Sequence, residues 1–265
     1  MEVVICPNAA EVGRVAARKV ASVCRAAGRN AVLGVATGSS PLATYAELAK
    51  LVDSGDLDLS EAQAFALDEY VGLPEGHPQS YAEVIRTTVT EPLRMQPSRV
   101  HVPAGHSADI DAAAVEYEQL IQAAGGVDVQ ILGVGSNGHI GFNEPVSSLA
   151  SRTRIKTLTA RTRADNARFF ASPDEVPHHC LTQGLGTIMD ARQVVLVAQG
   201  KWKAAAVAAL VEGPIAAMVP GSVLQLHRFA TIVVDEDAAS ELKMSDYYRA
   251  AFDHKPGWQQ FDQVN

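Results

Sequence analysis

Apolar and polar positions follow two different spacings along the chain. Short continuous apolar runs, each typical of a buried strand, occur at residues 2–6, 31–36, 62–67, 100–102, 127–132, 193–198 and 230–234. Between them, apolar residues recur every three or four positions, which predicts helices over residues 9–27, 41–51, 109–124 and 201–212. Strands that alternate with helices require parallel crossovers. The pattern therefore predicts an α/β fold with an open, mostly parallel sheet and helices on both faces.

Local signals mark several element ends. Asn8, with Glu11 three residues later, resembles a helix N-cap with its capping partner, and Gly28 ends that helix. Ser80 is expected to cap a further helix, after a loop rich in Gly and Pro over residues 71–79. A strand-like run at residues 155–158 lies within an otherwise polar stretch. These signals agree with the alternation of strands and helices.

Composition and charge narrow the class of protein. The chain has 265 residues, 47% of them hydrophobic, and shows no linker or shift in composition, so we expect a single domain over residues 1–265. Its net charge of -8 comes without a basic stripe, which argues against nucleic-acid binding. The longest apolar run, residues 204–211, is too short to span a membrane, and the N-terminus lacks the pattern of a signal peptide. We therefore expect a soluble, cytoplasmic protein.

Cysteine and histidine spacings predict neither disulfides nor a metal site. Cys6, Cys24 and Cys180 are far apart and odd in number, and no CxxC pair occurs. The adjacent residues His178 and His179 are interpreted as surface residues, because neighbouring side chains usually point apart. We expect no metal and no cofactor.

The stretch that most suggests chemistry follows the apolar run 127–132. It carries a His and a Glu, at His139 and Glu144, with Asn137 just before, and three glycines at positions 133, 135 and 138. Glycines let the backbone turn sharply and let a ligand approach closely. In α/β folds, ligands bind at the carboxyl ends of the strands, so this turn is a candidate active site.

Two other interpretations of this turn are open. The glycine spacing matches a dinucleotide fingerprint, but that motif needs a helix directly after the glycines, and here Gly141 and Pro145 interrupt any helix. A purely structural turn, in which His139 only caps the strand, explains the glycines equally well. Other residues must therefore decide between structure and function.

Two groups of residues suit a phosphate. Residues 37–40, Thr-Gly-Ser-Ser, join a strand to a helix N-terminus, where free N–H groups and the helix dipole favour an anion. Lys201 and Lys203 lie in the first turn of a predicted helix, a position that costs a cation ~0.3–1 kcal/mol unless an anion offsets it. An ordinary N-cap and two solvated lysines would leave the same pattern.

Asp68 is a candidate general base because it stands where a strand ends. The neighbouring Glu69 should point to the opposite side, so we expect only one of the two carboxylates to face a cleft. The alternative is a loop carboxylate that caps the next turn. No serine or cysteine stands in a recognisable nucleophile elbow, so the sequence does not suggest covalent acyl chemistry.

Several stretches together resemble the glucosamine-6-phosphate deaminase family. They are LDEYVGL at 67–73, GVGSNGHIGFNEP at 133–145, SRTR at 151–154, ATGSSP at 36–41 and LTQGLGTIMDA at 181–191. The resemblance extends over nearly the whole chain. The related 6-phosphogluconolactonases share a Gly-rich turn with GH but lack the FNEP continuation, so this string is specific. The implied fold is an open α/β sheet similar to a modified Rossmann arrangement.

The resemblance implies an activity and a role for each site residue. Members of the family convert D-glucosamine 6-phosphate and water to D-fructose 6-phosphate and ammonia without a cofactor. Asp68 would be the base for enolisation, and His139 the acid/base for ring opening, assisted by Glu144 and Asn137. The phosphate would be held by Gly38, Ser39, Ser40, Arg168 and Lys203. Position 137 is aspartate in the best-known members, and asparagine here should alter the pH dependence without abolishing activity.

The resemblance also implies regulation. Ser147, Arg154, Lys156 and Thr157 match positions of an activator site for N-acetylglucosamine 6-phosphate in the allosteric members. That site lies between subunits, which implies a homo-oligomer, a hexamer in the family's pattern. The C-terminal tyrosine of the site has no clear counterpart, although Tyr247 and Tyr248 lie near the matching position.

Three alternatives to a deaminase stay open. The same fold could serve a 6-phosphogluconolactonase or a sugar-phosphate isomerase. A non-catalytic sugar-phosphate sensor is the third, but such proteins usually carry a basic DNA-binding helix pair, and this chain begins with its first strand. We therefore expect an enzyme of amino-sugar metabolism.

Overall fold

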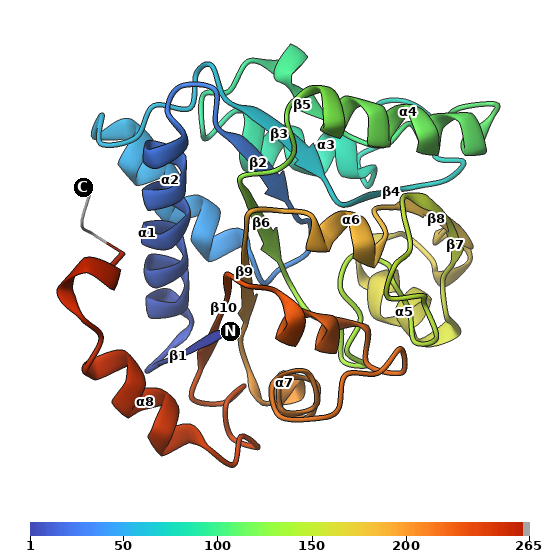
Figure 1. Ribbon diagram of the computed structural model, residues 1–265. Coiled ribbons are helices and arrows are strands. Elements are labelled where there is room, and N and C mark those ends of the chain that lie inside the picture. Colours follow the sequence, from blue (N-terminus) through green and yellow to red (C-terminus); the bar gives the residue numbers. More distant parts are fainter. Residues whose placement is uncertain (262–265) are drawn as a thin grey trace.

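A seven-stranded parallel sheet forms the centre of the computed structural model, which describes residues 1–261 (Figure 1). The strand order is β1-β10-β9-β6-β2-β3-β5, and every neighbouring pair is parallel. The strands are β1 (Glu2–Cys6), β2 (Val32–Val35), β3 (Gln63–Ala66), β5 (Val100–His101), β6 (Val129–Leu132), β9 (Gln193–Ala198) and β10 (Ala230–Asp235). Each matches a predicted apolar run to within two residues at either end, so the predicted mostly parallel sheet is confirmed.

Helices cover both faces of this sheet, as predicted. One hydrophobic cluster joins the sheet to α1 and α2, and a second, on the other face, joins it to α4, α6 and α7. Side chains alternate between the two: Ile131 belongs to the first cluster and Leu132 to the second. The helices are α1 (Ala9–Ala27), α2 (Leu42–Asp53), α3 (Tyr81–Ile85), α4 (Ile110–Ala123), α5 (Ala160–Asn166), α6 (Leu185–Met189), α7 (Ala204–Val211) and α8 (Ser245–Asp253).

A second, three-stranded sheet was not predicted. It is antiparallel, with the order β4-β8-β7, and in Figure 1 it lies beside α5 at the right of the view. Its strands are β4 (Asp68–Tyr70), β7 (Arg154–Thr157) and β8 (His179–Thr182). We expected residues 68–70 only as the end of the strand before them. The chain instead leaves the large sheet after Ala66 and joins the small one, which brings Asp68 opposite Thr182.

The predicted caps are present. Asn8 Oδ1 accepts a hydrogen bond from Glu11 N at 3.0 Å, and Ser80 Oγ accepts one from Glu83 N at 3.2 Å. Gly28 ends α1 with a φ of 80°, in the left-handed region where glycine is favoured. The helix predicted from residue 201 begins instead as a 3₁₀ turn, Lys201–Lys203, before α7. Within residues 1–261, the helices lack the combination of length and apolar character that a membrane span requires.

Candidate active site

A cavity of about 360 Å³ opens at the carboxyl ends of β2, β3 and β6. Its walls come from the loop after β2, from Asp68, from the Gly-rich turn after β6, from α5 and from the 3₁₀ turn before α7. These segments are far apart in the sequence, and the parallel sheet brings them together because its strands all end at one edge. The cavity contains most of the candidate residues, including Gly38, Ser39, Ser40, Asp68, His139, Arg168 and Lys203.

The Gly-rich turn is too tight for side chains at its glycines. A Cβ at Gly135 would lie 2.2 Å from Cε1 of His139, and one at Gly138 would lie 2.8 Å from Cγ1 of Val219. Gly138 also has a φ of 84°, and its N–H donates to the Gly135 carbonyl at 2.9 Å. Residues 133–150 continue as turns and loops, not as a helix. The helix that a dinucleotide fingerprint requires is therefore replaced by a turn that packs the His139 ring against Gly135.

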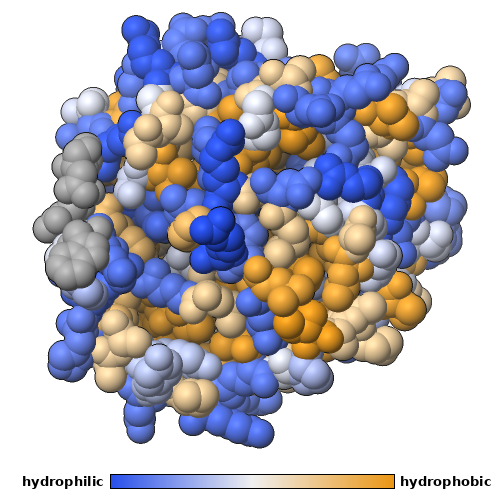
Figure 2. All heavy atoms as spheres, viewed as in Figure 1, coloured by the Kyte–Doolittle hydropathy of each residue, from blue (hydrophilic) through white to orange (hydrophobic). Residues whose placement is uncertain are grey.

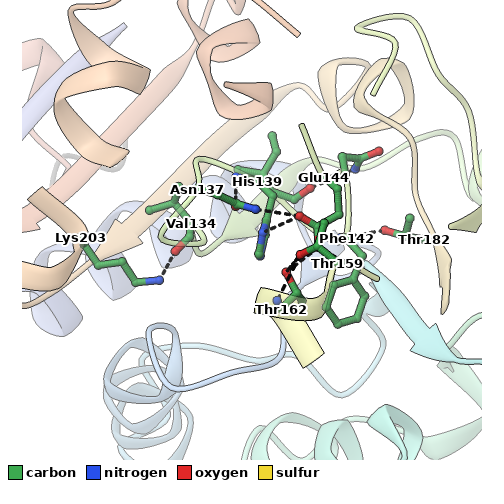
Figure 3. A network of polar contacts seen from close by, with 11 residues as sticks. Val134, Asn137, His139, Phe142, Glu144, Thr159, Thr162, Thr182 and Lys203 are labelled. Atoms are coloured by element: carbon green, nitrogen blue, oxygen red, sulfur yellow. Dashed lines mark hydrogen bonds and ion pairs between the residues drawn. The ribbon is translucent and has the colours of Figure 1, made fainter. Parts of the chain in front are cut away.

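His139, Asn137 and Glu144 form one contact network (Figure 3). Oε2 of Glu144 lies 3.6 Å from Nδ1 of His139 and accepts a hydrogen bond from Nδ2 of Asn137 at 2.8 Å. Oδ1 of Asn137 in turn accepts from the backbone N of His139 at 3.2 Å. The turn thus presents the imidazole to the cavity with a carboxylate behind it.

The charge of Glu144 is set by its hydrogen bonds. Burial acts to raise the pKa of Glu144, but the nearby His139 and the hydrogen bonds from Thr162 and Asn137 outweigh burial and hold the pKa at about 2. Its other oxygen, Oε1, accepts from the backbone N of Thr159 at 3.3 Å, from Oγ1 of Thr159 at 3.2 Å and from Oγ1 of Thr162. Glu144 is therefore an anion throughout the neutral range.

Asp68 has the opposite environment. It is 5% exposed, and burial first and the charge of Glu69 second raise the pKa of Asp68 to about 8. The Glu69 carboxylate points elsewhere and accepts from the backbone N atoms of Tyr70, Tyr81 and Ala82 at 2.7–2.9 Å. Only Asp68 of the adjacent pair lines the cavity. A carboxylate with a pKa close to neutrality can both accept and return a proton.

The phosphate-binding candidates lie together in the cavity. Gly38 has a φ of 88°, which lets residues 38–40 turn their backbone toward the cavity. Lys203 is buried, and Nζ donates to the Val134 carbonyl (Figure 3). Burial lowers the pKa of Lys203 to about 8, against an opposing effect of Asp165 and with a smaller contribution from Arg168. Lys201 is exposed and does not line the cavity, so only one of the two lysines can contact a ligand there.

Several cavity or network residues were missed in the sequence, among them Trp202, Thr159 and Thr162. Trp202 is 56% exposed, lines the cavity and covers Lys203, whose Nζ lies 3.7 Å from the ring centroid. An aromatic residue between two lysines was a signal for such a cation–π contact. Thr159 and Thr162 donate hydrogen bonds to Glu144. The one sequence feature that could have pointed to them is the N-cap of the short helix α5, in which Thr159 Oγ1 accepts a hydrogen bond from Thr162 N at 3.1 Å.

The residues matched to an activator site lie outside the cavity. Ser147 is buried, and Arg154, Lys156 and Thr157 lie on β7. Nη1 of Arg154 donates to Oδ1 of Asn143 at 2.8 Å, directly before Glu144 in the chain. Tyr248 donates instead to Oε1 of Glu212 at 3.1 Å.

The part of the chain that the structure describes contains neither a metal-binding cluster nor a disulfide. No cluster of three or more His, Cys, Asp or Glu side chains there is placed to hold a metal ion. All three cysteines are free and buried, and the exposed pair His178 and His179 lies on the surface, as expected.

Comparisons with known proteins agree with this geometry. Residues 7–233 match the model of the family described as glucosamine-6-phosphate isomerases/6-phosphogluconolactonase. The chain is 59% identical over 259 residues to the glucosamine-6-phosphate deaminase of Arthrobacter sp. strain FB24, covering 98% of this chain and 99% of the relative. It is 56% identical to the enzyme of the same name from Streptomyces coelicolor over 260 residues, again covering 98% and 99%.

Two solved structures have similar folds. A monomeric glucosamine-6-phosphate deaminase superposes with a TM-score of 0.88 at 41% identity, covering 91% of this chain and all of the other (100%). The 6-phosphogluconolactonase of Trypanosoma brucei superposes with a TM-score of 0.71 at 18% identity, covering 91% and 98%. The second likeness shows the fold alone.

Proposed function

The chain belongs to the glucosamine-6-phosphate isomerase/6-phosphogluconolactonase family, and we propose that it converts D-glucosamine 6-phosphate and water to D-fructose 6-phosphate and ammonia. The observation that carries the proposal is the pairing, in one site, of a carboxylate with a raised pKa, Asp68, and an imidazole backed by an ionised carboxylate, His139 with Glu144. The two relatives named above, which share more than half of the sequence, are both deaminases by name.

Substrate binding follows from the positive end of the cavity. Lys203, Arg168 and the backbone N–H groups of residues 38–40 hold the phosphate of the sugar. A phosphate dianion next to Lys203 also favours the charged form of the lysine, which burial alone disfavours. Because the phosphate is attached at C6, anchoring it sets how far the reacting carbons C1 and C2 reach toward Asp68 and His139.

The chemistry divides between the two proton carriers. His139 moves a proton between O1 and the ring oxygen O5, which opens the ring and frees the C1 aldehyde. As Asp68 removes the proton from C2, O1 takes up a proton that the C2 ammonium group releases, giving an enolamine. Asp68 then returns its proton to C1, which leaves a protonated imine at C2. Water adds to that imine carbon, ammonia leaves, and the C2 ketone of fructose 6-phosphate remains.

The raised pKa of Asp68 has a role in this sequence. In the empty site the carboxyl is largely protonated at neutral pH, because its pKa is about 8. The substrate carries an ammonium group on C2, and a cation beside a buried carboxyl favours the ionised form. Binding of the amino sugar therefore prepares the base that its own enolisation requires.

The proposal is tested by assaying the purified protein on two substrates. We expect stoichiometric ammonia and fructose 6-phosphate from glucosamine 6-phosphate, and no accelerated hydrolysis of 6-phosphogluconolactone. Lactone hydrolysis without ammonia release would replace the proposal by the lactonase alternative. Conversion of glucose 6-phosphate at a comparable rate would instead favour a sugar-phosphate isomerase.

The proposal also includes allosteric activation and assembly into a homo-oligomer. Ser147, Arg154, Lys156 and Thr157 are the candidate residues for activation by N-acetylglucosamine 6-phosphate in a homo-oligomer, such as a hexamer. Exposed apolar side chains support self-association: Val146, Ile215 and Met218 are exposed, and Figure 2 shows hydrophobic residues gathered over the 3₁₀ segment Pro220–Leu226 and the loop before it. The solved relative at 41% identity is described as monomeric. Sedimentation with and without the activator distinguishes a monomer from a homo-oligomer, and rate curves measured under the same conditions show whether the activator raises the rate.

Domain organisation, cofactor use and location are also part of the proposal. Residues 1–265 act as one sugar-phosphate deaminase unit, without a metal or cofactor of their own. A cytoplasmic location fits an enzyme whose substrate and product are both sugar phosphates.

A further inference from the structure

Helix α5 and its N-cap residue contact the Glu144 oxygen that does not face His139. The first turn of α5 supplies three donors to one oxygen, Oε1: the backbone N of Thr159 at 3.3 Å, its hydroxyl at 3.2 Å, and the hydroxyl of Thr162 (Figure 3). The other oxygen, Oε2, is the one near His139 and Asn137. The two oxygens of one carboxylate therefore have different tasks: α5 holds Oε1, and Oε2 faces the imidazole.

The Thr162 hydroxyl is the donor that serves Glu144 most fully. A hydroxyl has one proton to donate. That of Thr159 has two acceptors within reach, Glu144 Oε1 at 3.2 Å and Thr162 Oγ1 at 3.0 Å. Within residues 1–261, that of Thr162 has Glu144 Oε1 as its acceptor. Thr162 is 4% exposed, so this hydrogen bond is largely shielded from solvent.

We propose that Thr162 is a positioning residue for the proton shuttle: its hydroxyl fixes the Glu144 carboxylate so that Oε2 stays against His139. The inference rests on the proposed function, since it assigns a part in ring opening. Without the hydroxyl, Oε1 keeps the longer contacts to Thr159, at 3.2–3.3 Å, and Oε2 keeps the bond from Asn137 at 2.8 Å, so the carboxylate is held less tightly and its orientation can shift. A shift of this kind moves Oε2 away from its place 3.6 Å from Nδ1 of His139.

The position of Thr162 also links this network to the cavity wall. Arg161, Thr162, Asp165 and Asn166 of α5 all line the cavity. The helix that closes one side of the substrate site is thus the same element that holds the carboxylate behind the imidazole. A purely structural role would use Thr162 as a buried N-terminal residue of α5 and would leave His139 unaffected.

Three variants, with a replacement for the first, test the proposal. Thr162→Val removes the hydroxyl at constant size, and Thr162→Ser keeps it. Thr90→Val is the matched control, because Thr90 is equally buried and loses only a 3.3 Å hydrogen bond to the Ile85 carbonyl, away from the cavity. If Thr162→Val does not fold, Thr162→Cys, whose thiol is a weak donor of similar size, takes its place.

The expected result is a split between turnover and binding. Thr162→Val should lower kcat by roughly 10-fold, since a hydrogen bond to a charged group is lost, with KM within roughly twofold of wild type. Thr162→Ser should restore kcat, and Thr90→Val should keep wild-type kcat. A Thr162→Val protein that loses only thermal stability, to the same degree as Thr90→Val, would overturn the proposal.

A second readout does not depend on turnover. The titratable groups that face Glu144 are His139, from the Gly-rich turn, and Cys180, from β8. In a carbon-13 NMR titration, with Glu144→Gln to assign the signal, the Glu144 carboxyl should titrate at higher pH in Thr162→Val than in wild type. Identical titrations would contradict the proposal even if the wild-type protein released no ammonia. Inactivity of the wild type alone would instead contradict the proposed function.

Discussion

Asp68 and Glu144 are buried to a similar degree, with exposures of 5% and 3%, yet their pKa values are displaced in opposite directions. The region around Asp68 offers the carboxylate a second negative charge, from Glu69, and within residues 1–261 no group donates a hydrogen bond to it. The region around Glu144 offers Oε1 and Oε2 donors from Asn137, Thr159 and Thr162. The difference therefore comes from the neighbours, which are His139 and several donors for Glu144 and a like charge for Asp68, and burial alone does not set the charge of a carboxylate.

Two carboxylates with separated pKa values allow two roles in one site. Asp68, with a pKa of about 8, can exchange protons with a substrate at neutral pH. Glu144, with a pKa of about 2, stays charged and serves as the fixed partner of His139. Gly141 brings the two regions together: a Cβ at this position would lie 3.5 Å from Oδ2 of Asp68, at the end of the turn that carries His139. Substitutions at Asp68 and around Glu144 should therefore affect turnover and stability in different ways.

The largest effect is expected from Asp68→Asn. The amide has the same shape but cannot accept the C2 proton, so ammonia release should fall by at least ~10²–10⁴-fold, the usual contribution of general-base catalysis. Binding of the sugar phosphate and ring opening at His139 should persist. The measurement is turnover together with calorimetric binding of glucosamine 6-phosphate. Near-normal turnover would show that Asp68 is only a loop cap.

Lys203→Ala tests whether the buried lysine of the cavity binds the phosphate of the substrate. Lys203 is also desolvated, which disfavours its charged form, and a bound phosphate would offset that cost. Losing a charge-assisted contact worth ~1.5–3 kcal/mol should raise KM about 10- to 100-fold with a smaller change in kcat. Lys201→Ala is the control, because Lys201 lies two residues away, is exposed and does not line the cavity. Equal KM values in the two variants would exclude the phosphate role.

The large sheet could be predicted from the sequence because its signals are local. The strands at Glu2–Cys6 and Gln193–Ala198 coincide with continuous apolar runs, and short segments between helices leave few topologies. The pairing of the small sheet could not be predicted, although its strand β7 (Arg154–Thr157) overlaps the strand-like run expected at residues 155–158. β8 has four residues, two of them polar, and its partner Asp68 is separated from Thr182 by a stretch of mixed structure. Long-range antiparallel pairing of such short segments leaves no periodic pattern.

In the candidate site, too, contacts between residues close in the sequence could be predicted, and long-range contacts could not. Asn137, His139 and Glu144 fall within eight positions, 137–144, so their association could be predicted from one motif. The contact of Thr162 with Glu144 spans 18 positions and passes through β7, so it depends on how α5 packs. Trp202 was missed because an exposed aromatic side chain has no periodic signature, although it covers Lys203.

A smaller effect is expected on the free energy of unfolding, which should depend on pH in opposite directions through Asp68 and through Glu144. Asp68 has a folded-state pKa above its unfolded value, so wild-type stability is lost as pH rises from about 4 to about 8. Asp68→Asn should therefore be more stable than wild type at pH 8, by roughly 1–3 kcal/mol, and the gain should shrink toward pH 4. Glu144 has a lowered pKa, so its contribution is present above about pH 4.5 and is lost as pH falls toward about 2.

Glu144→Gln should accordingly destabilise the protein at pH 7, by roughly 1–3 kcal/mol, and the loss should shrink as pH falls below about 4.5. Urea unfolding of wild type and both variants across pH 3–9 measures both slopes. Destabilisation by both substitutions at pH 8 would mean that Asp68 has stabilising partners comparable to those of Glu144, and the comparison would fail.

The smallest effect is expected from Asn137→Asp, which makes the region of Glu144 resemble that of Asp68. The aspartate can still accept from the backbone N of His139, but it loses the amide donor 2.8 Å from Glu144 Oε2 and places a like charge there. Two carboxylates at this distance share a proton, so the pair should bind one at higher pH than Glu144 alone. A carboxylate still faces His139, so turnover at pH 8 should stay within a few-fold of wild type, while the acid limb of the pH–rate profile should move up by ~1 unit. Asn166→Asp adds the same charge to the same cavity on α5, away from the Glu144 oxygens, and should leave that limb in place. If both variants move the limb equally, general field effects govern the site, and the specific donors to Glu144 do not.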